Sequence, residues 1–541
     1  QNSPTDDIPT LNAGASRTST KSEKTGYRIA SVFGRVNYNY QMKYLLSLVA
    51  RYDGISRLKD NRWGFFPGVS VGWNVTEEDF WKESKISEVI SNIKPRLSWG
   101  VNGNVNGIGN FDIYGIYKQI GAGNYDGATA YYNSSLINTG LRWEQSRSFE
   151  AGLDLGFFNN RLSFIFDYYN RTTDDLLTDV NLPAYTGFSS MKTNLGKLRN
   201  SGFEMEVRAN ILSNAKGFNW EVSANLTSVS NKVLKLPTSD KPFNQIDGYE
   251  VAAGLYNPET GETPTKWIGG YREGGKLGDM VGYVQNHIFR DWNDVKANAN
   301  MVIDEVANLY GPGMANEINP QTGVTYAESN GWKPIEPGDV CWEDINKDGK
   351  INSLDRAVVG NIFPKVTGGF STTLSYKNWS LYARFDYALG HTIYNDLKAR
   401  SLGQYQGQFN IIDKVHDTWS ETNPDTDLPV FTYADQLNKK NITRSNNGNT
   451  AVDNNSSRFY EKGDYLALRE ITLSYSLPKK WIGKAGMQDA SVYVTGQNLF
   501  YITGYDGVSP EPAVSTVYGR GIDNGRYPTP RTLLFGLSVT F

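Results

Sequence analysis

Arg531-Thr-Leu-Leu-Phe-Gly-Leu-Ser-Val-Thr-Phe541 has an apolar side chain at every second position from Leu533 to Phe541. The positions between them are mostly small or polar, as at Thr532, Gly536 and Ser538. A period of two predicts an extended strand with one oily face. We expect this face to lie in a protein core or against lipid, because the strand ends on an aromatic residue without a covering tail.

Composition narrows the choice once length is considered. The chain has 541 residues, of which 39% are hydrophobic and 13% aromatic, and its mean hydropathy is −0.49. Since no run of about 18 apolar residues occurs, membrane-spanning helices are excluded. A polar average does not exclude a membrane barrel, in which only every second strand residue faces lipid. The 33 Tyr, 24 Phe and 13 Trp fit interfacial aromatic girdles, although soluble carbohydrate-binding sandwiches can also be rich in aromatics.

Charge and cysteine content exclude several functions. The 54 Lys and Arg nearly balance the 57 Asp and Glu, without a basic stripe, so we expect no nucleic-acid partner. The single Cys341 allows no intrachain disulfide. His287, His391 and His416 have no triad context, so we expect no catalytic residues and no enzyme activity. The chain opens without Met or a signal region, which indicates processing, truncation or a fragment.

The same alternation recurs along the chain and predicts about 15 strands, each close to the ~9–11 residues that cross a bilayer when tilted. The predicted strands are 27–40, 42–53, 63–74, 95–101, 149–158, 161–171, 202–212, 218–227, 266–272, 278–289, 367–376, 379–390, 465–477, 490–501 and 531–541. We therefore predict an all-β fold, a transmembrane antiparallel β-barrel.

Connection lengths support this fold. Short turns follow Phe158, Leu212, Arg272 and Tyr376, and a mid-sized turn follows Leu477. Short turns on one side and long loops on the other are typical of outer-membrane barrels. Residues 1–26 are expected to form an exposed arm, and long extracellular loops are expected at about 102–141, 172–199, 230–264, 290–365, 391–463 and 502–529.

An open sheet in lipid would leave two edges of unpaired backbone N–H and C=O groups, at a cost of several kcal/mol per group, roughly. We therefore expect an upstream polypeptide to supply the missing strands.

Several segments resemble the carboxy-terminal barrel half of the SusC/RagA family of TonB-dependent outer-membrane transporters of Bacteroidota. They are 33–40 (FGRVNYNY), 51–57 (RYDGISR), 63–73 (WGFFPGVSVGW), 100–104 (GVNGN), 194–204 (NLGKLRNSGFE) and 496–500 (GQNLF). The resemblance implies an outer-membrane barrel of about 22 strands. It further implies a plug and a TonB-contacting segment that have no counterpart here, a SusD-like surface lipoprotein as partner, and import of oligosaccharides or oligopeptides.

Residues 344–355 (DINKDGKINSLD) match a calcium-loop pattern, with Gly349 at the sharp turn. The expected ligands are side-chain oxygens of Asp344, Asn346, Asp348, Asn352 and Asp355 and the carbonyl of Lys350. Asp355 replaces the usual closing Glu, which shortens its reach. The alternative is an acidic turn that holds no metal.

Aromatic residues in the long loops could stack on sugar rings or peptide side chains, or could instead serve packing and girdles. They are Tyr394, Tyr405, Trp419, Tyr433, Tyr505, Tyr518 and Tyr527. Charges expected in the lumen could guide a substrate or form a network between strands. These are Glu204, Glu206, Arg208, Arg384 and Asp386.

Two other classes of protein remain open on the residues alone. A soluble multi-sandwich carbohydrate-binding or hydrolytic protein would be extracted without detergent and would have an acid pair in a cleft. A passive porin or barrel adhesin would lack the plug and its TonB-contacting segment.

Overall fold

The computed structural model describes residues 24–115, 117–125, 128–404, 412–431, 439–442, 444, 455–483, 486–511, 521–525 and 527–541. Within this part of the chain, the main antiparallel sheet has 13 strands in the order β1-β2-β3-β4-β7-β8-β9-β10-β21-β22-β26-β27-β29. They are β1 (Ile29–Tyr40), β2 (Tyr44–Ile55), β3 (Trp63–Trp73), β4 (Ile90–Asn104), β7 (Glu144–Phe157), β8 (Leu162–Asn181), β9 (Ser190–Ala215), β10 (Phe218–Lys235), β21 (Val366–Tyr376), β22 (Trp379–Leu389), β26 (Tyr465–Ser476), β27 (Asp489–Thr503) and β29 (Thr532–Thr540).

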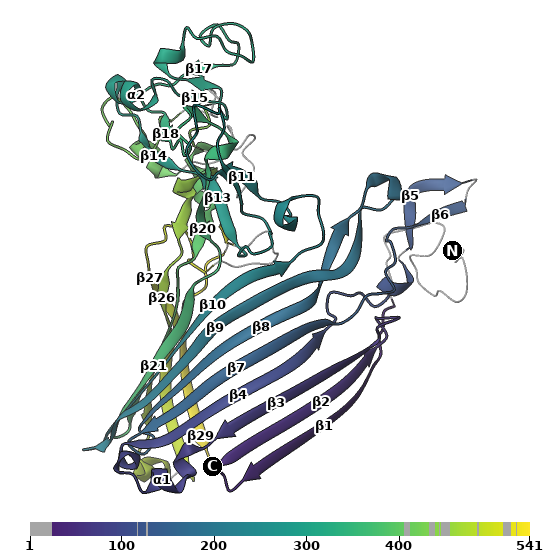
Figure 1. The fold of residues 1–541 in the computed structure, drawn as a ribbon. Helices are drawn as coiled ribbons and strands as arrows, with labels where there is room; N and C mark the ends of the chain where they lie inside the picture. Colours follow the sequence, from purple (N-terminus) through teal and green to yellow (C-terminus); the bar gives the residue numbers. More distant parts are fainter. Residues whose placement is uncertain are drawn as a thin grey trace. The chain divides into compact units, whose positions relative to one another are not determined.

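The chain divides into two units. The first comprises residues 1–205, 230–244 and 272–275, and the second comprises residues 206–229, 245–271 and 276–541. Strands β1, β2, β3, β4, β7 and β8 of the first unit run side by side in Figure 1.

Cross-strand pairing in the first unit produces rows of one chemical character. One row across β1, β2, β3, β4 and β7 is apolar: Tyr38, Leu46, Val71, Leu97 and Ala151. The adjacent row on the opposite face is polar: Asn37, Ser47, Ser70, Ser98 and Glu150. Because neighbouring strands keep the same register, the alternation within each strand becomes a two-faced wall.

The second unit repeats this arrangement. Its apolar row comprises Trp220, Leu374, Leu381, Leu473, Val494 and Phe535. The polar row on the other face comprises Ser223, Ser371, Arg384, Glu470, Gln497 and Thr532. Phe535 is 81% exposed and Trp220 is partly exposed, so the apolar rows do not form a dry interior. The terminal segment is thus the two-faced strand that its sequence predicts.

Two predicted barrel strands are wrong. Residues 266–272 and 278–289 contribute only β12 (Thr265–Ile268), β13 (Asp279–Tyr283) and β14 (Gln285–Ile288), which belong to small separate sheets. These strands have 4 or 5 residues, fewer than the ~9–11 needed to cross a bilayer. The alternating apolar residues of these short strands pack in the small cores of the loops.

The connections alternate in length, but one predicted loop is wrong. The expected loop 172–199 is mostly strand, because β8 extends to Asn181 and β9 begins at Ser190. The remaining long connections contain short elements. They are β5 (Tyr117–Tyr125), β6 (Ala128–Asn133), β11 (Tyr249–Ala252), β15 (Ile303–Asp304), β16 (Leu309–Tyr310), β17 (Lys333–Pro334), β18 (Val340–Trp342), β19 (Lys350–Ile351), β20 (Arg356–Asn361), β23 (Thr392–Asn395), β24 (Asn455–Ser456), β25 (Tyr460–Lys462), β28 (Ile522–Asp523), α2 (Trp292–Ala299) and α3 (Asp396–Ala399).

On the side of the shorter turns, α1 (Asp79–Lys82) follows β3 and α4 (Lys479–Ile482) follows β26. No helix among the described residues is long and apolar enough to cross a membrane. The expected arm of residues 1–26 lies, up to residue 23, outside the described residues.

Candidate functional site

The loop that carries the calcium pattern lies between β18 and β20 and is shaped by its own side chains. The N–H of Gly349 donates to Asp344 Oδ2 (2.8 Å), and the N–H of Lys350 donates to Asp348 Oδ1 (2.8 Å). Gly349 has φ +79°, a conformation that glycine adopts without steric cost. The predicted sharp turn at this glycine is therefore present.

Asp355 closes the same loop from a fully buried position. Its two carboxylate oxygens accept from the N–H groups of Ile345 (2.9 Å) and Asn352 (2.8 Å). Burial raises the pKa of Asp355 to about 7, and burial also raises the pKa of Asp344. Backbone donors act in the opposite direction on both carboxyls, so desolvation is the larger effect.

A neighbouring hairpin holds this loop in place. The amide of Asn346 donates to Thr263 Oγ1 (2.9 Å), and the N–H of Tyr256 donates to the carbonyl of Asn346 (2.7 Å). Carboxylate, amide and carbonyl oxygens are donors that suit calcium. Within the described residues, however, no group of three His, Cys, Asp or Glu side chains has a metal-binding arrangement. Calcium binding therefore stays a prediction.

Two of the predicted ligand-stacking rings are buried. Tyr394 is fully buried, and its hydroxyl accepts from the amide of Asn455 (2.6 Å). Tyr505 is also buried and donates to Asp523 Oδ2 (2.8 Å). Neither ring presents a face to a ligand in this structure, so the prediction of stacking is wrong for both and loop packing accounts for them.

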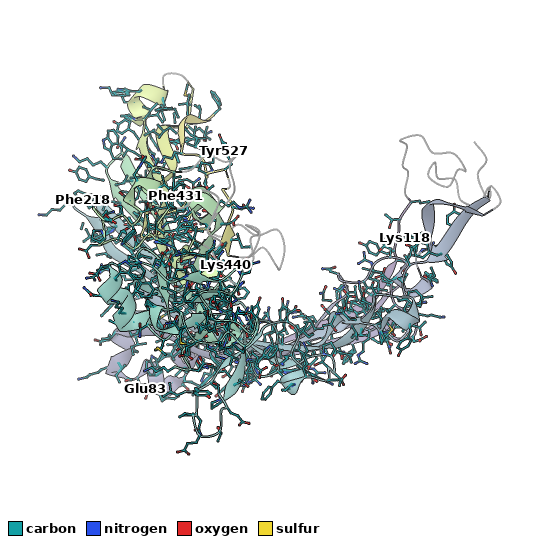
Figure 2. The ribbon with its side chains drawn as sticks, turned by 90° about the horizontal axis from the view of Figure 1, so that it is seen from above. Glu83, Lys118, Phe218, Phe431, Lys440 and Tyr527 are labelled. Carbon is teal, nitrogen blue, oxygen red and sulfur yellow. The ribbon has the colours of Figure 1, made fainter. Side chains whose placement is uncertain are left out.

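The other predicted aromatic residues differ in exposure. Tyr527 is 95% exposed and is free to contact a ligand (Figure 2). Trp419 is half-buried and donates through Nε1 to the carbonyl of Arg290 (3.2 Å). Tyr405, Tyr433 and Tyr518 lie outside the described residues.

A polar groove of about 620 Å³ lies on the polar face of the second unit. Glu206, Glu221, Arg384 and Asp386 contribute charges of both signs, and small residues such as Ser371 keep it open. Four of the five lumen charges that the sequence predicts line this groove, namely Glu206, Arg208, Arg384 and Asp386.

Arg469 is the residue of this groove that sequence reasoning missed. Its guanidinium forms an ion pair with Asp386 through Nη2 and Oδ2 (2.9 Å) and donates to Tyr501 Oη (3.0 Å). Arg469 also pairs with Glu511. It sits at a register shift between Leu468 and Glu470, which breaks the period-two rule. The position of this bulge could not be found from the sequence, so sequence reasoning could not have placed Arg469 in the groove.

One Cys, one His and one Asp approach one another in the loops without forming a nucleophilic site. His287 is the cross-strand partner of Cys341, and His287 Nε2 lies 3.2 Å from Asp294 Oδ1. Burial, with a further contribution from Asp294, raises the pKa of Cys341 to about 12. The thiol therefore stays protonated at neutral pH and is a packing group.

Known proteins share this arrangement. Residues 1–298 match the family model described as TonB dependent receptor-like, beta-barrel. TonB-dependent receptor P3 of Formosa agariphila is 31% identical over 95% of this chain and 45% of its own length. TonB-dependent receptor SusC of Bacteroides thetaiotaomicron is 30% identical over 96% of this chain and 45% of its own length. The chain thus spans about half the length of these curated relatives.

Solved structures support the fold. The RagAB peptide transporter superposes with a TM-score of 0.68 at 22% identity, over 99% of this chain and 50% of that chain. The family match confirms the outer-membrane location, the SusC/RagA resemblance and the expectation that the chain is not an enzyme, and it removes the soluble sandwich alternative. The chain belongs to the TonB-dependent receptor-like β-barrel family of outer-membrane proteins.

Proposed function

We propose that this chain is part of a transporter that imports oligosaccharides or oligopeptides across the outer membrane, driven through TonB. The observation that carries the proposal is the two-faced wall, with apolar rows on one face and polar rows on the other. Such a wall separates lipid from a wet lumen. The relatives named above support an active receptor rather than a passive porin.

The polar groove supports a substrate with many hydrogen-bonding groups. Its charges of both signs and its hydroxyl groups suit sugars and peptide backbones better than a purely anionic or cationic ligand. The name of one structural relative, a peptide transporter, favours peptides, and that of SusC leaves glycans open.

Uptake of labelled oligopeptides and oligosaccharides by cells tests this function. Arg384 lines the groove, while Leu381 of the same strand lies in the apolar row and does not line the groove. We expect Arg384→Ala to lower uptake and Leu381→Met, the matched control, to leave it unchanged. Loss of TonB should abolish uptake; uptake that persists without TonB would instead support a passive porin.

The full-length protein is proposed to close the sheet with further strands. Among the described residues, β1 and β29 are the two ends of the strand order. Unpaired backbone groups are expensive in lipid, and the relatives are about twice as long as this chain. A cross-link between cysteines placed in β1 and in the added strand would support closure, and failure at every register would contradict it.

A SusD-like surface lipoprotein is proposed as the partner on the side of the long loops. The structural relative solved as RagAB supports a paired assembly. Affinity purification of the full-length protein in mild detergent should retain a lipoprotein in equal amount. Purification without any lipoprotein, from cells that express the neighbouring genes, would contradict this pairing.

Calcium is proposed as a stiffening ion in the loop of residues 344–355. Asp344, Asp348 and Asp355 lie in one loop and have no ion pair with Lys or Arg among the described contacts. A cation coordinated by oxygens would offset their mutual repulsion.

A further inference from the structure

A second groove, of about 630 Å³, opens on the apolar face of the second unit. It lies where β21, β22, β26 and β27 reach the long loops. Tyr387 pairs with Leu466, which pairs with Ile502, while Val366 pairs with Leu389. Leu226 completes the apolar lining. The groove therefore belongs to the face that meets lipid.

The floor of the groove is hydrocarbon although it contains a tyrosine. A Cβ at Gly368 would lie 2.6 Å from the hydroxyl oxygen of Tyr387, so the tyrosine side chain occupies the space left by this glycine. The Tyr387 hydroxyl donates to the carbonyl of Asn225 (3.2 Å). With its polar atom engaged, the ring presents only carbon to the groove.

The loop-side rim of the groove has one lysine, Lys365, beside the carboxylate of Asp464, which lines the groove. Lys365 precedes Val366, and its aliphatic stem runs along Gly390. Its backbone N–H donates to the carbonyl of Leu389 (2.9 Å), which fixes it beside the groove. Lys365 is exposed and has no ion pair among the described residues. The carboxylate of Asp464 at the same rim accepts from the N–H of Gly390.

An apolar trough with the exposed Lys365 at its loop end suits an amphiphile with an acyl chain and an anionic head group. The trough continues an apolar belt that includes the exposed rings of Phe370 and Phe500, and Phe370 pairs with Phe385. We propose that this groove is a specific site for a phosphorylated membrane lipid of the loop-side leaflet, with an acyl chain over Tyr387 and the phosphate at Lys365.

Strand β21 offers matched controls at its two ends. Val366 lines the groove, and Leu374 lies on the same face beyond it. Lys365 precedes the strand, and Lys377 follows it in the opposite turn. The test variants are therefore Val366→Trp, which fills the groove, and Lys365→Glu, which reverses the charge. Their controls are Leu374→Trp and Lys377→Glu.

The experiment is native mass spectrometry of the full-length protein after exchange into detergent with either lipid A or zwitterionic phosphatidylethanolamine. Variants that fold are identified by gel electrophoresis, because a folded barrel migrates differently before and after heating. We expect the parent protein and both controls to retain lipid A. In each test variant the amount of bound lipid A should fall about fivefold or more. Equal retention by a test variant and its control, or equal retention of the two lipids, overturns the proposal.

Discussion

The guanidinium of Arg444 forms a bidentate ion pair with the carboxylate of Asp304, with Nη1 to Oδ2 at 2.7 Å and Nη2 to Oδ1 at 2.9 Å. Arg444 also lies over the rings of Tyr283 and Trp342, at 4.8 and 4.4 Å from their centroids. All of these residues are buried. The pair therefore joins two segments of the loops that are 140 residues apart in sequence.

Breaking this pair should destabilise the loops strongly. Arg444→Ala leaves the buried Asp304 carboxylate without its partner, which costs ~3–5 kcal/mol in such pairs. Hydrogen exchange of the amides in β15 and β18 measures the free energy of local opening. Arg290→Ala is the control, because the Arg290–Asp425 pair is exposed and contributes ~0–1 kcal/mol. Equal effects of the two substitutions would contradict a special role for Arg444.

Glu78 should make the turn after β3 sensitive to acid. Hydrogen bonds from Tyr44 Oη (2.7 Å), Lys43 Nζ (3.0 Å) and Trp73 Nε1 (3.1 Å) lower the pKa of Glu78 to about 2. A carboxyl group whose pKa is lowered by folding stabilises the folded state at pH values above its unfolded pKa of ~4.3. That stabilisation is lost as the pH falls toward about 2.

Hydrogen exchange of residues 74–83, corrected for the intrinsic rate at each pH, checks this expectation. Protection should fall between about pH 4 and pH 2 in the parent protein. Glu78→Gln should remove this dependence, and Glu77→Gln, in an exposed pair with Lys82, should leave it in place. Constant protection of the parent protein over this range would contradict the stabilising role of the hydrogen bonds to Glu78.

Calcium should stabilise the loop of residues 344–355 through Asp348. We expect added calcium to raise the thermal midpoint of the parent protein and a chelator to lower it, because oxygen ligands order the loop. Asp348→Ala should remove most of this difference. Glu343→Ala, next to the loop but outside its ligand pattern, is the control. An unchanged calcium response in Asp348→Ala would count against the site.

Substitutions at Tyr394 and Tyr527 should distinguish a role in packing from a role in ligand binding. Tyr394→Phe removes the acceptor for the Asn455 amide and should cost ~1–3 kcal/mol of stability without altering substrate affinity. Tyr527→Ala should change stability by less than ~0.5 kcal/mol, since its ring is exposed. Calorimetric binding and thermal unfolding of both variants measure the two effects. A selective loss of affinity in Tyr394→Phe would reverse the assignment.

The sequence predicts the wall of the barrel well because the alternation of side chains within each strand indicates which face is apolar and which is polar. Trp379 to Leu389 alternates in the sequence, and the same residues alternate between the two faces of β22. Local patterns are sufficient there, since every long strand meets the same two solvents.

The loops and the site were less predictable because their contacts are distant in sequence. Tyr394 looks like an exposed loop aromatic until Asn455 is placed beside it. Arg469 does not follow the period-two rule, because a bulge moves it into the polar groove. Short strands such as β13 alternate like barrel strands but pack in small cores, where Val281 is fully buried.

Spin-label accessibility tests most directly whether the two faces meet lipid and water. Labels would replace Phe203, Trp220, Phe385 or Phe535 on the apolar face, and Glu204, Glu221, Arg384 or Ser538 on the polar face, in full-length protein that carries Cys341→Ala. We expect oxygen to relax the first set more strongly and a water-soluble nickel chelate to relax the second set more strongly. Equal accessibility of the two sets, or the reverse order, would contradict a membrane-spanning wall.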